Sequence, residues 1–202
     1  MTTMANVLIP LTWRRTQTAR LLLDAALILA GSALVALSAR VAIPLPFTPV
    51  PVTAQTFAVL LVGAVLGSRR GALALAAYLA EGAAGMPVFS GGGCCVAWLA
   101  GPTAGYLWSY PLAAFTVGAL AERGWDRSPG RAGLAMLAGN GLIYVVALPW
   151  LATFVGAGQV LEAGLLPFIP GDLLKVALAA AALPAAWAVV GRERPPHGAG
   201  GG

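Results

Sequence analysis

Residues Leu21–Ala39 read LLLDAALILAGSALVALSA, an apolar run that holds a single charged side chain, Asp24. A helix needs about 20 apolar residues to cross the hydrocarbon core of a bilayer, and about 17 is the usual lower limit. This run therefore predicts a membrane-spanning helix. No small-residue cleavage pattern follows it, so we expect it to stay in the protein as a first span.

Further apolar runs repeat this pattern along the chain. Together the runs are Leu21–Ala39, Ala54–Leu66, Gly71–Ala84, Thr103–Ala121, Ala132–Val155 and Leu173–Val190. The second and third are short for a span, so each must borrow residues from its flanks or lie where protein surrounds it. The expected fold is an all-α integral membrane protein with six transmembrane helices in one domain.

The composition supports a protein in a lipid bilayer. Hydrophobic residues make up 59% of the chain and charged residues only 9%, whereas soluble domains carry about 25% charged residues. Most of the surface therefore cannot face water. We expect a multi-pass protein of the cell membrane.

The placement of the basic residues predicts the orientation. With six spans and a cytoplasmic N-terminus, the basic residues on the inner side are Arg14, Arg15, Arg20, Arg69, Arg70, Arg123, Arg127, Arg131, Arg192 and Arg194. Only Arg40 and Lys175 remain toward the outer face. This positive-inside asymmetry places both termini in the cytoplasm. It also explains the net charge of +5 without a nucleic-acid partner. The expected parts are a cytoplasmic segment 1–20, a six-helix membrane domain 21–191 and a disordered cytoplasmic tail 192–202.

Two expected outer loops are apolar but unsuited to helix. Residues 43–53 read IPLPFTPVPVT, in which four prolines favour a stiff, extended segment. Residues 85–101 are uncharged and rich in glycine. These loops could fold over a cavity between the helices as a lid, or rest on lipid headgroups. The residues alone leave both interpretations open.

Polar side chains within the spans are few, and each is a functional candidate because burying it in hydrocarbon is costly. Asp172 and Lys175 share one face at the start of the last helix. They form either a structural pair or a site for a carboxylate ligand. Glu81 could contact a ligand or cap loop groups, and Asn140, between two glycines, favours helix packing over ligand contact.

The chemistry visible in the sequence is that of binding. The glycines at 91–93 lack the Lys-Ser/Thr of a phosphate-binding loop, and His197 is the only histidine. We therefore expect no ATP hydrolysis, no catalytic triad, no metal and no cofactor. Ala26 and Ala30 form a small-residue stripe, which lets helices approach closely either within the fold or against a partner.

The chain resembles the BioY family, the biotin-binding S components of energy-coupling factor (ECF) transporters. Segments that occur in the order and spacing of that family are PVPVTAQT at 49–56, Tyr78, GMPVF at 85–89, GPTAGY at 101–106 and PGDLLK at 170–175. The resemblance covers residues from about Ala25 to Val190, and Cys94-Cys95 departs from the family pattern.

The resemblance implies a six-helix, S-component-like bundle with a biotin pocket near the outer face, closed by the first and third loops. On this basis Lys175 would pair with the biotin carboxylate, and Asp172 would accept from a ureido N–H or orient Lys175. Residues Thr53 and Gln55 would add polar contacts from the first loop. The apolar walls would come from Tyr78, Phe89 and Trp150. Arg40 would be an interfacial anchor or, as the less favoured alternative, a second candidate cation.

The resemblance also implies partners: a membrane coupling protein and two cytosolic ATPases, with the stripe at Ala26 and Ala30 facing the coupling protein. A homo-oligomer is left open. Two rival functions stay in view. One is an S component for a different vitamin. The other is an integral membrane enzyme with Glu81 and Asp172 as paired carboxylates, against which the shortage of other polar residues argues.

Overall fold

The computed structural model describes residues 3–8 and 16–192. The expected tail beyond Arg192 and the basic residues Arg14, Arg15 and Arg194 lie outside the described residues. Each expected apolar run forms a helix. These helices are α2 (Gln17–Ser38), α3 (Gln55–Leu66), α4 (Ser68–Ala83), α6 (Ala104–Glu122), α7 (Pro129–Val155) and α9 (Ile169–Arg192).

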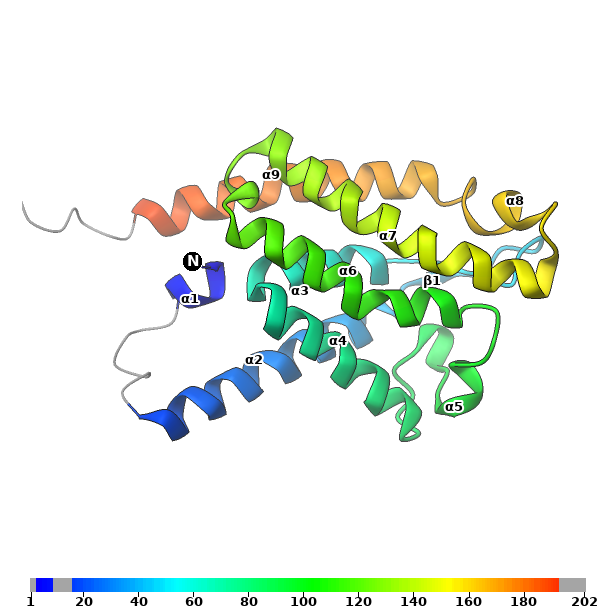
Figure 1. Ribbon diagram of the computed structural model, residues 1–202, viewed down its shortest axis with the longest axis horizontal. Coiled ribbons are helices and arrows are strands. Elements are labelled where there is room, and N and C mark those ends of the chain that lie inside the picture. The colour runs from blue at the N-terminus through cyan, green and yellow to red at the C-terminus, as the bar shows by residue number, and fades with distance from the viewer. Residues whose placement is uncertain (1–2, 9–15, 193–202) are drawn as a thin grey trace, which may run out of the picture.

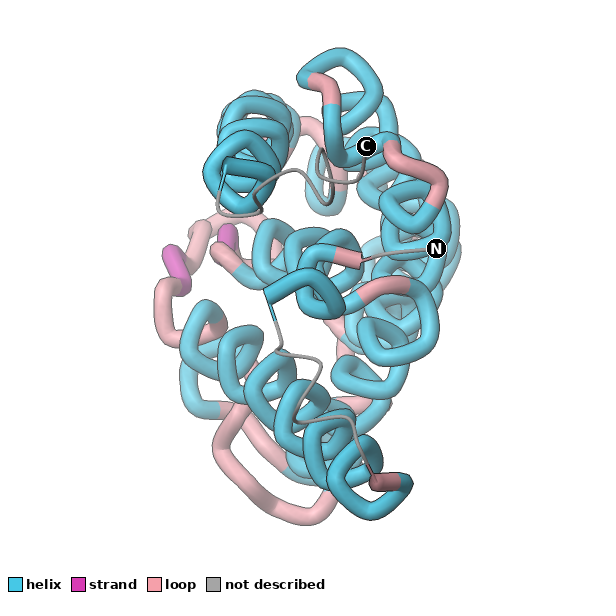
Figure 2. The backbone as a smooth tube through the Cα atoms, turned by 90° about the vertical axis from the view of Figure 1, so that its left-hand side faces the viewer, coloured by secondary structure: helices cyan, strands magenta, loops and turns pink. Residues whose placement is uncertain are grey.

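The long helices form a bundle along the long axis of the molecule (Figure 1), and a view turned by 90° shows them clustered around a common core (Figure 2). Short elements join them. These are α1 (Met4–Leu8), β1 (Ala42–Ile43), β2 (Val52–Thr53), η2 (Ser90–Gly92), α5 (Cys95–Trp98), η3 (Trp125–Arg127) and α8 (Val160–Gly164). The strands pair antiparallel, with Ala42 opposite Thr53, so the proline-rich segment between them is closed at its base by a hairpin.

Helix α6 packs closely against α3, α4 and α7 because small residues let these helices approach one another. A Cβ atom on Gly118 would lie 2.4 Å from the backbone nitrogen of Ser68 at the start of α4. A Cβ atom on Gly63 of α3 would lie 2.5 Å from the carbonyl oxygen of Ala114 in α6. Backbone therefore packs on backbone at both contacts, which leaves no room for a side chain.

The second and third apolar runs were expected either to include flanking residues or to be surrounded by protein, and each does one of the two. Helix α3 has 12 residues, about 18 Å of helix, and most of its side chains are buried by the surrounding protein. Helix α4 borrows Ser68, Arg69 and Arg70 from the preceding joint. Gly67 makes the sharp turn between α3 and α4 at φ +88°, in the left-handed region that favours glycine.

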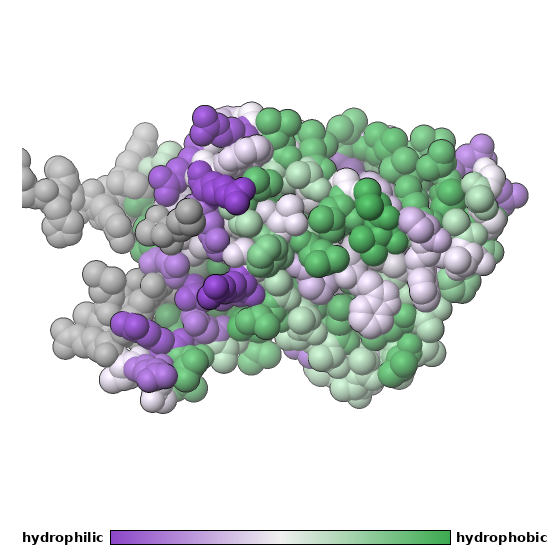
Figure 3. Space-filling model, viewed as in Figure 1, coloured by the Kyte–Doolittle hydropathy of each residue, from purple (hydrophilic) through white to green (hydrophobic). Residues whose placement is uncertain are grey.

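The outer surface of the bundle suits lipid. Helix α2, helix α7 and residues Ile169–Val190 of α9 are long and apolar enough to cross a membrane. Leu22 and Leu37 of α2 and Val145 of α7 are among the exposed large apolar side chains. In Figure 3 hydrophilic residues gather near the end of the bundle where α1 lies, and apolar residues cover much of the rest of the visible face. The protein is thus a helical membrane protein.

The proline-rich loop packs on protein. The Thr48 hydroxyl donates to the carbonyl oxygen of Ala163 in α8 at 2.6 Å, and Val50 is buried. The glycine-rich loop at residues 85–101 is also held, because the carbonyl oxygen of its Pro87 accepts a hydrogen bond from the Arg40 guanidinium at 2.7 Å. Of the two interpretations that the sequence leaves open, these contacts favour loops folded over the helices.

Candidate functional site

A cavity lies between the ends of α3, α6, α7 and α9, beside the proline-rich loop. It holds about 580 Å³ of empty space, part of it open to solvent. Small-molecule pockets typically combine apolar walls with a few polar groups. The residues that line it are Val50, Pro51, Thr53, Gln55, Thr56, Ser90, Trp98, Thr103, Tyr106, Leu107, Tyr110, Asn140, Ile143, Tyr144, Phe168, Asp172 and Lys175.

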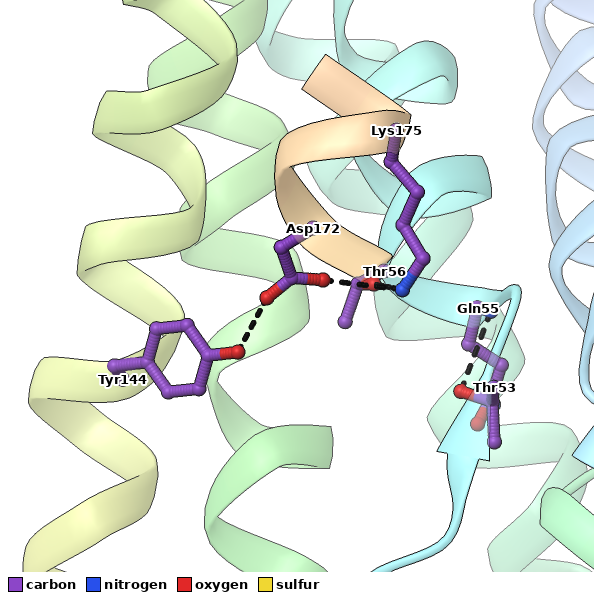
Figure 4. Close-up of polar contacts among 6 residues, drawn as sticks. All are labelled: Thr53, Gln55, Thr56, Tyr144, Asp172 and Lys175. Carbon is purple, nitrogen blue, oxygen red and sulfur yellow. Dashed lines mark hydrogen bonds and ion pairs between the residues drawn. The ribbon is translucent and has the colours of Figure 1, made fainter. Parts of the chain in front are cut away.

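A polar cluster centred on Asp172 occupies one wall of this cavity (Figure 4). Lys175 donates from Nζ to Asp172 Oδ1 at 3.1 Å and to Thr56 Oγ1 at 2.9 Å. The Tyr144 hydroxyl donates to the other carboxylate oxygen of Asp172. Both oxygens of Asp172 therefore have protein partners, which supports a role in holding Lys175. An ammonium group has three donors, so Lys175 keeps one N–H for a ligand.

The first turn of α9 explains why these side chains meet. Asp172 is favoured near the positive end of the helix dipole, and the i, i+3 spacing places Lys175 on the same face one turn further on. The formal charges cancel, so a pair that is mostly buried needs no further counter-ion.

Thr53 and Gln55 line the cavity from β2 and from the first residue of α3, as the sequence interpretation placed them. The Gln55 backbone N–H donates to Thr53 Oγ1 at 3.3 Å. Gln55 Nε2 donates to the Tyr78 hydroxyl at 2.5 Å, and this hydroxyl donates to the carbonyl oxygen of Val88 at 3.1 Å. The start of α3 is thereby fixed to α4 and to the loop after it.

Tyr78, Phe89 and Trp150 are not among the residues that line the cavity. Tyr78 and Phe89 are fully buried against each other, edge to face, with ring centroids 5.4 Å apart. Trp150 is 38% exposed and donates from Nε1 to the carbonyl oxygen of Gly101 at 2.9 Å. Their contact with a ligand stays a prediction, and their placement gives them packing roles next to the site.

The apolar and aromatic walls come from residues that sequence reasoning did not assign to the site. They are Trp98, Tyr106, Leu107, Tyr110, Ile143 and Phe168. One signal was available: the chain has four tyrosines, of which three line the cavity and the fourth, Tyr78, bonds to Gln55. The sequence leaves open whether such an aromatic faces a pocket or a membrane interface.

Asn140 lines the cavity, and its Nδ2 atom is buried without a hydrogen-bond partner. We expected this amide to serve helix packing, but its Nδ2 atom makes no hydrogen bond to another helix. The described residues include three buried side-chain atoms without a partner, and two of them, in Asn140 and Ser90, belong to cavity-lining residues. Native proteins pair nearly all buried polar groups, so these two atoms indicate a cavity built for a ligand.

The other candidates lie away from the cavity. Glu81 accepts a hydrogen bond from the Ser32 hydroxyl at 2.5 Å and links α4 to α2, so it does not pair with Asp172. Arg40 is held by Pro87 and is not a lining residue. Ala26 and Ala30 are exposed on α2. Within residues 3–8 and 16–192, no group of three or more His, Cys, Asp or Glu residues could hold a metal ion.

The chain is similar to several named proteins. The biotin transporter BioY of Rhizobium etli is 41% identical over 157 residues, which are 73% of this chain and 83% of that protein. The biotin transporter BioY of Thermotoga maritima is 41% identical over 156 residues, which are 74% of this chain and 86% of that protein.

The fold has a solved counterpart. The crystal structure of the S-component for biotin from an ECF-type ABC transporter matches with a TM-score of 0.74 and 24% identity. The match covers 89% of this chain and 95% of that chain, and it supports the same bundle architecture. The model of the BioY family matches residues 6–192, which is nearly all of the described chain. This chain therefore belongs to the BioY family.

Proposed function

We propose that this chain captures biotin at the outer face of the cell membrane for uptake by an ECF-type, ATP-driven transporter. The family membership, the two biotin transporters and the S-component fold support this function. The protein is a substrate-binding transport subunit and not an enzyme.

The observation that carries the proposal is a cavity with largely apolar walls and an ion pair, Asp172 and Lys175, on one wall. Biotin has flat, apolar fused rings, a ureido group that donates and accepts hydrogen bonds, and a valerate chain that ends in a carboxylate. The remaining N–H of Lys175 would bind the carboxylate, and Asp172 would orient Lys175. Thr53 and Gln55 would add further polar contacts.

Six spans and cytoplasmic termini complete the proposed topology. Exposed Arg20, Arg69 and Arg123 lie near the starts of α2 and α4 and the end of α6. These helix ends meet at one end of the bundle (Figure 1). A shared basic end of this kind faces the cytoplasm under the positive-inside rule. The cavity at the opposite end would then open outward.

A membrane coupling protein and two cytosolic ATPases would supply the energy. The small side chains of Ala26 and Ala30 are exposed on α2, where a helix of another protein could approach closely. This surface is the proposed contact for the coupling protein. The lipid bilayer covers the other exposed apolar faces.

The decisive test is equilibrium binding of biotin to the purified chain in detergent. We expect tight binding that Lys175→Ala weakens by about ten- to a hundredfold, because a charge-assisted hydrogen bond contributes about 1.5–3 kcal/mol. Arg40→Ala is the matched control, since it removes the other outer cation outside the cavity. Unchanged binding by Lys175→Ala together with a loss in Arg40→Ala would reverse the assignment.

The same assay tests the rival vitamin. Unlabelled vitamins compete with labelled biotin for the site, and we expect only biotin and its close analogues to displace it. If the folded wild-type chain does not bind biotin but binds another vitamin, the substrate assignment is wrong. Recovery of chemically unchanged biotin from the complex separates binding from enzymatic conversion.

A further inference from the structure

Asn140 is a buried polar side chain in the cavity that the cluster around Asp172 does not engage. It lies on α7, is 5% exposed and lines the cavity. Its Nδ2 atom has no hydrogen-bond partner. A buried amide N–H without an acceptor is costly, so a ligand that supplies the acceptor binds with an advantage.

Close helix packing fixes the position of this amide. A Cβ atom on the preceding Gly139 would lie 2.4 Å from Leu60 Cδ2 and 2.6 Å from Val117 Cγ2, so α7 presses against α3 and α6 at this point. Asn140 and Tyr144 are four residues apart and share the cavity face of α7. Asn140 is about 6 Å further toward the start of α7, away from the proline-rich loop.

The chemistry of the ligand then assigns a partner to the amide. Under the proposed function, the biotin carboxylate belongs to Lys175, and the strong acceptor that remains on biotin is the ureido carbonyl oxygen. We propose that Asn140 donates from Nδ2 to this oxygen and thereby selects for the ureido head group. This inference rests on the proposed function and deepens it. It makes Asn140 a specificity-determining residue.

Substitution of the donor by an acceptor gives the sharpest test. Asn140→Asp keeps the size of the side chain but removes the N–H donors. In 2-iminobiotin an imino group replaces the ureido oxygen, so it can donate to the new carboxylate. We expect the variant to bind biotin at least about tenfold more weakly, and the preference for biotin over 2-iminobiotin to fall by at least about tenfold.

Asn140→Ala and biotinamide, which lacks the ligand carboxylate, complete the design. The loss of affinity caused by Asn140→Ala should be as large for biotinamide as for biotin, because the amide acts at the other end of the ligand. Val145→Ala, on the exposed face of α7, is the matched control and should leave every affinity unchanged. If Asn140→Asp fails to fold, the alanine variant with the two ligands decides the question.

The outcomes separate the two levels of the proposal. If wild-type protein binds biotin and neither Asn140 variant changes affinity or preference, this inference is overturned and the proposed function stands. If the effect of Asn140→Ala disappears with biotinamide, Asn140 acts at the carboxylate and the inference is also overturned. If folded wild-type protein does not bind biotin, the proposed function and this inference fall together.

Discussion

At the residue scale, the site depends on how its polar side chains pair with one another. Both carboxylate oxygens of Asp172 accept hydrogen bonds from protein donors, one from Lys175 and the other from Tyr144. This arrangement holds the lysine in one rotamer before a ligand arrives, which reduces the entropy lost on binding. Tyr144 is thus a positioning residue, because it acts on a ligand through Asp172.

Tyr144→Phe tests this role. The substitution keeps the ring in the cavity wall and removes only the hydroxyl that donates to Asp172. We expect biotin binding to weaken by about three- to tenfold, because one hydrogen bond that orders the acceptor is lost. Equilibrium binding in detergent measures the effect, with the exposed Val145→Ala as control. An affinity equal to wild type would show that Asp172 and Lys175 keep their geometry without the hydroxyl.

The rarity of polar residues made part of the site predictable from the sequence. Asp172 and Lys175 stood out because hydrocarbon tolerates few polar groups, whereas Thr53 and Gln55 were assigned only from the family resemblance. The structure brings all four to one cavity. Tyr106, Tyr110 and Tyr144 were not assigned to the site, because an aromatic ring suits a pocket wall, a membrane belt or a protein core. The sequence offered no strong amphipathic pattern in α6 to show which way Tyr106 and Tyr110 face.

At the scale of elements, small residues decide how closely the helices pack. The six apolar runs predicted the long helices because continuous hydrophobicity marks them without any periodic pattern. The short elements α5 and α8 and the β1–β2 hairpin carry no such signal. Their positions depend on tertiary hydrogen bonds, such as that between Thr48 and Ala163.

Gly118→Ala and Gly141→Ala form a matched pair that tests the close packing. A Cβ atom on Gly118 would meet the backbone of Ser68, whereas one on Gly141 would meet no atom within 4 Å. We expect Gly118→Ala to destabilise the protein by about 1–3 kcal/mol and Gly141→Ala to be neutral or stabilising by up to about 1 kcal/mol. Thermal unfolding in one detergent measures both. Equal shifts in the two variants would contradict the packing argument.

The exposed stripe on α2 gives a second prediction at this scale. Ala26→Leu with Ala30→Leu should abolish biotin uptake in cells that contain the coupling module, because the bulky side chains block a close helix contact. Biotin binding by the purified variant should stay unchanged, since both residues lie outside the cavity. Ala177→Leu, at an exposed alanine of α9, is the control. Normal uptake by the double variant would show that this face of α2 is not the contact surface for the coupling protein.

At the scale of the whole molecule, the proposed orientation follows from charge alone. The loop with Cys94 and Cys95 belongs to the end of the bundle that carries the cavity, and Arg123 belongs to the opposite end. If the cavity opens outward, these two ends face different compartments. The exposed thiol of Cys95 is then a built-in reporter of topology.

Labelling of intact cells with a membrane-impermeant maleimide tests the orientation. We expect wild-type protein to react through Cys95. A variant with Cys94→Ser, Cys95→Ser and Arg123→Cys should react only after the cells are opened, because its single cysteine faces the cytoplasm. The opposite labelling pattern would mean that the bundle is inserted the other way round.

The cancelled charges of Asp172 and Lys175 have a consequence for the energetics of uptake. A biotin carboxylate added to this pair gives the loaded site a formal charge of minus one. Carrying that charge fully across an inside-negative membrane potential costs about 2.3 kcal/mol per 100 mV. Uptake should therefore slow as the potential is made more negative in vesicles, whereas uptake of uncharged biotinamide should not. Because the ion pair is neutral, each transport cycle would have to supply the free energy of moving the single negative charge of biotin against the membrane potential.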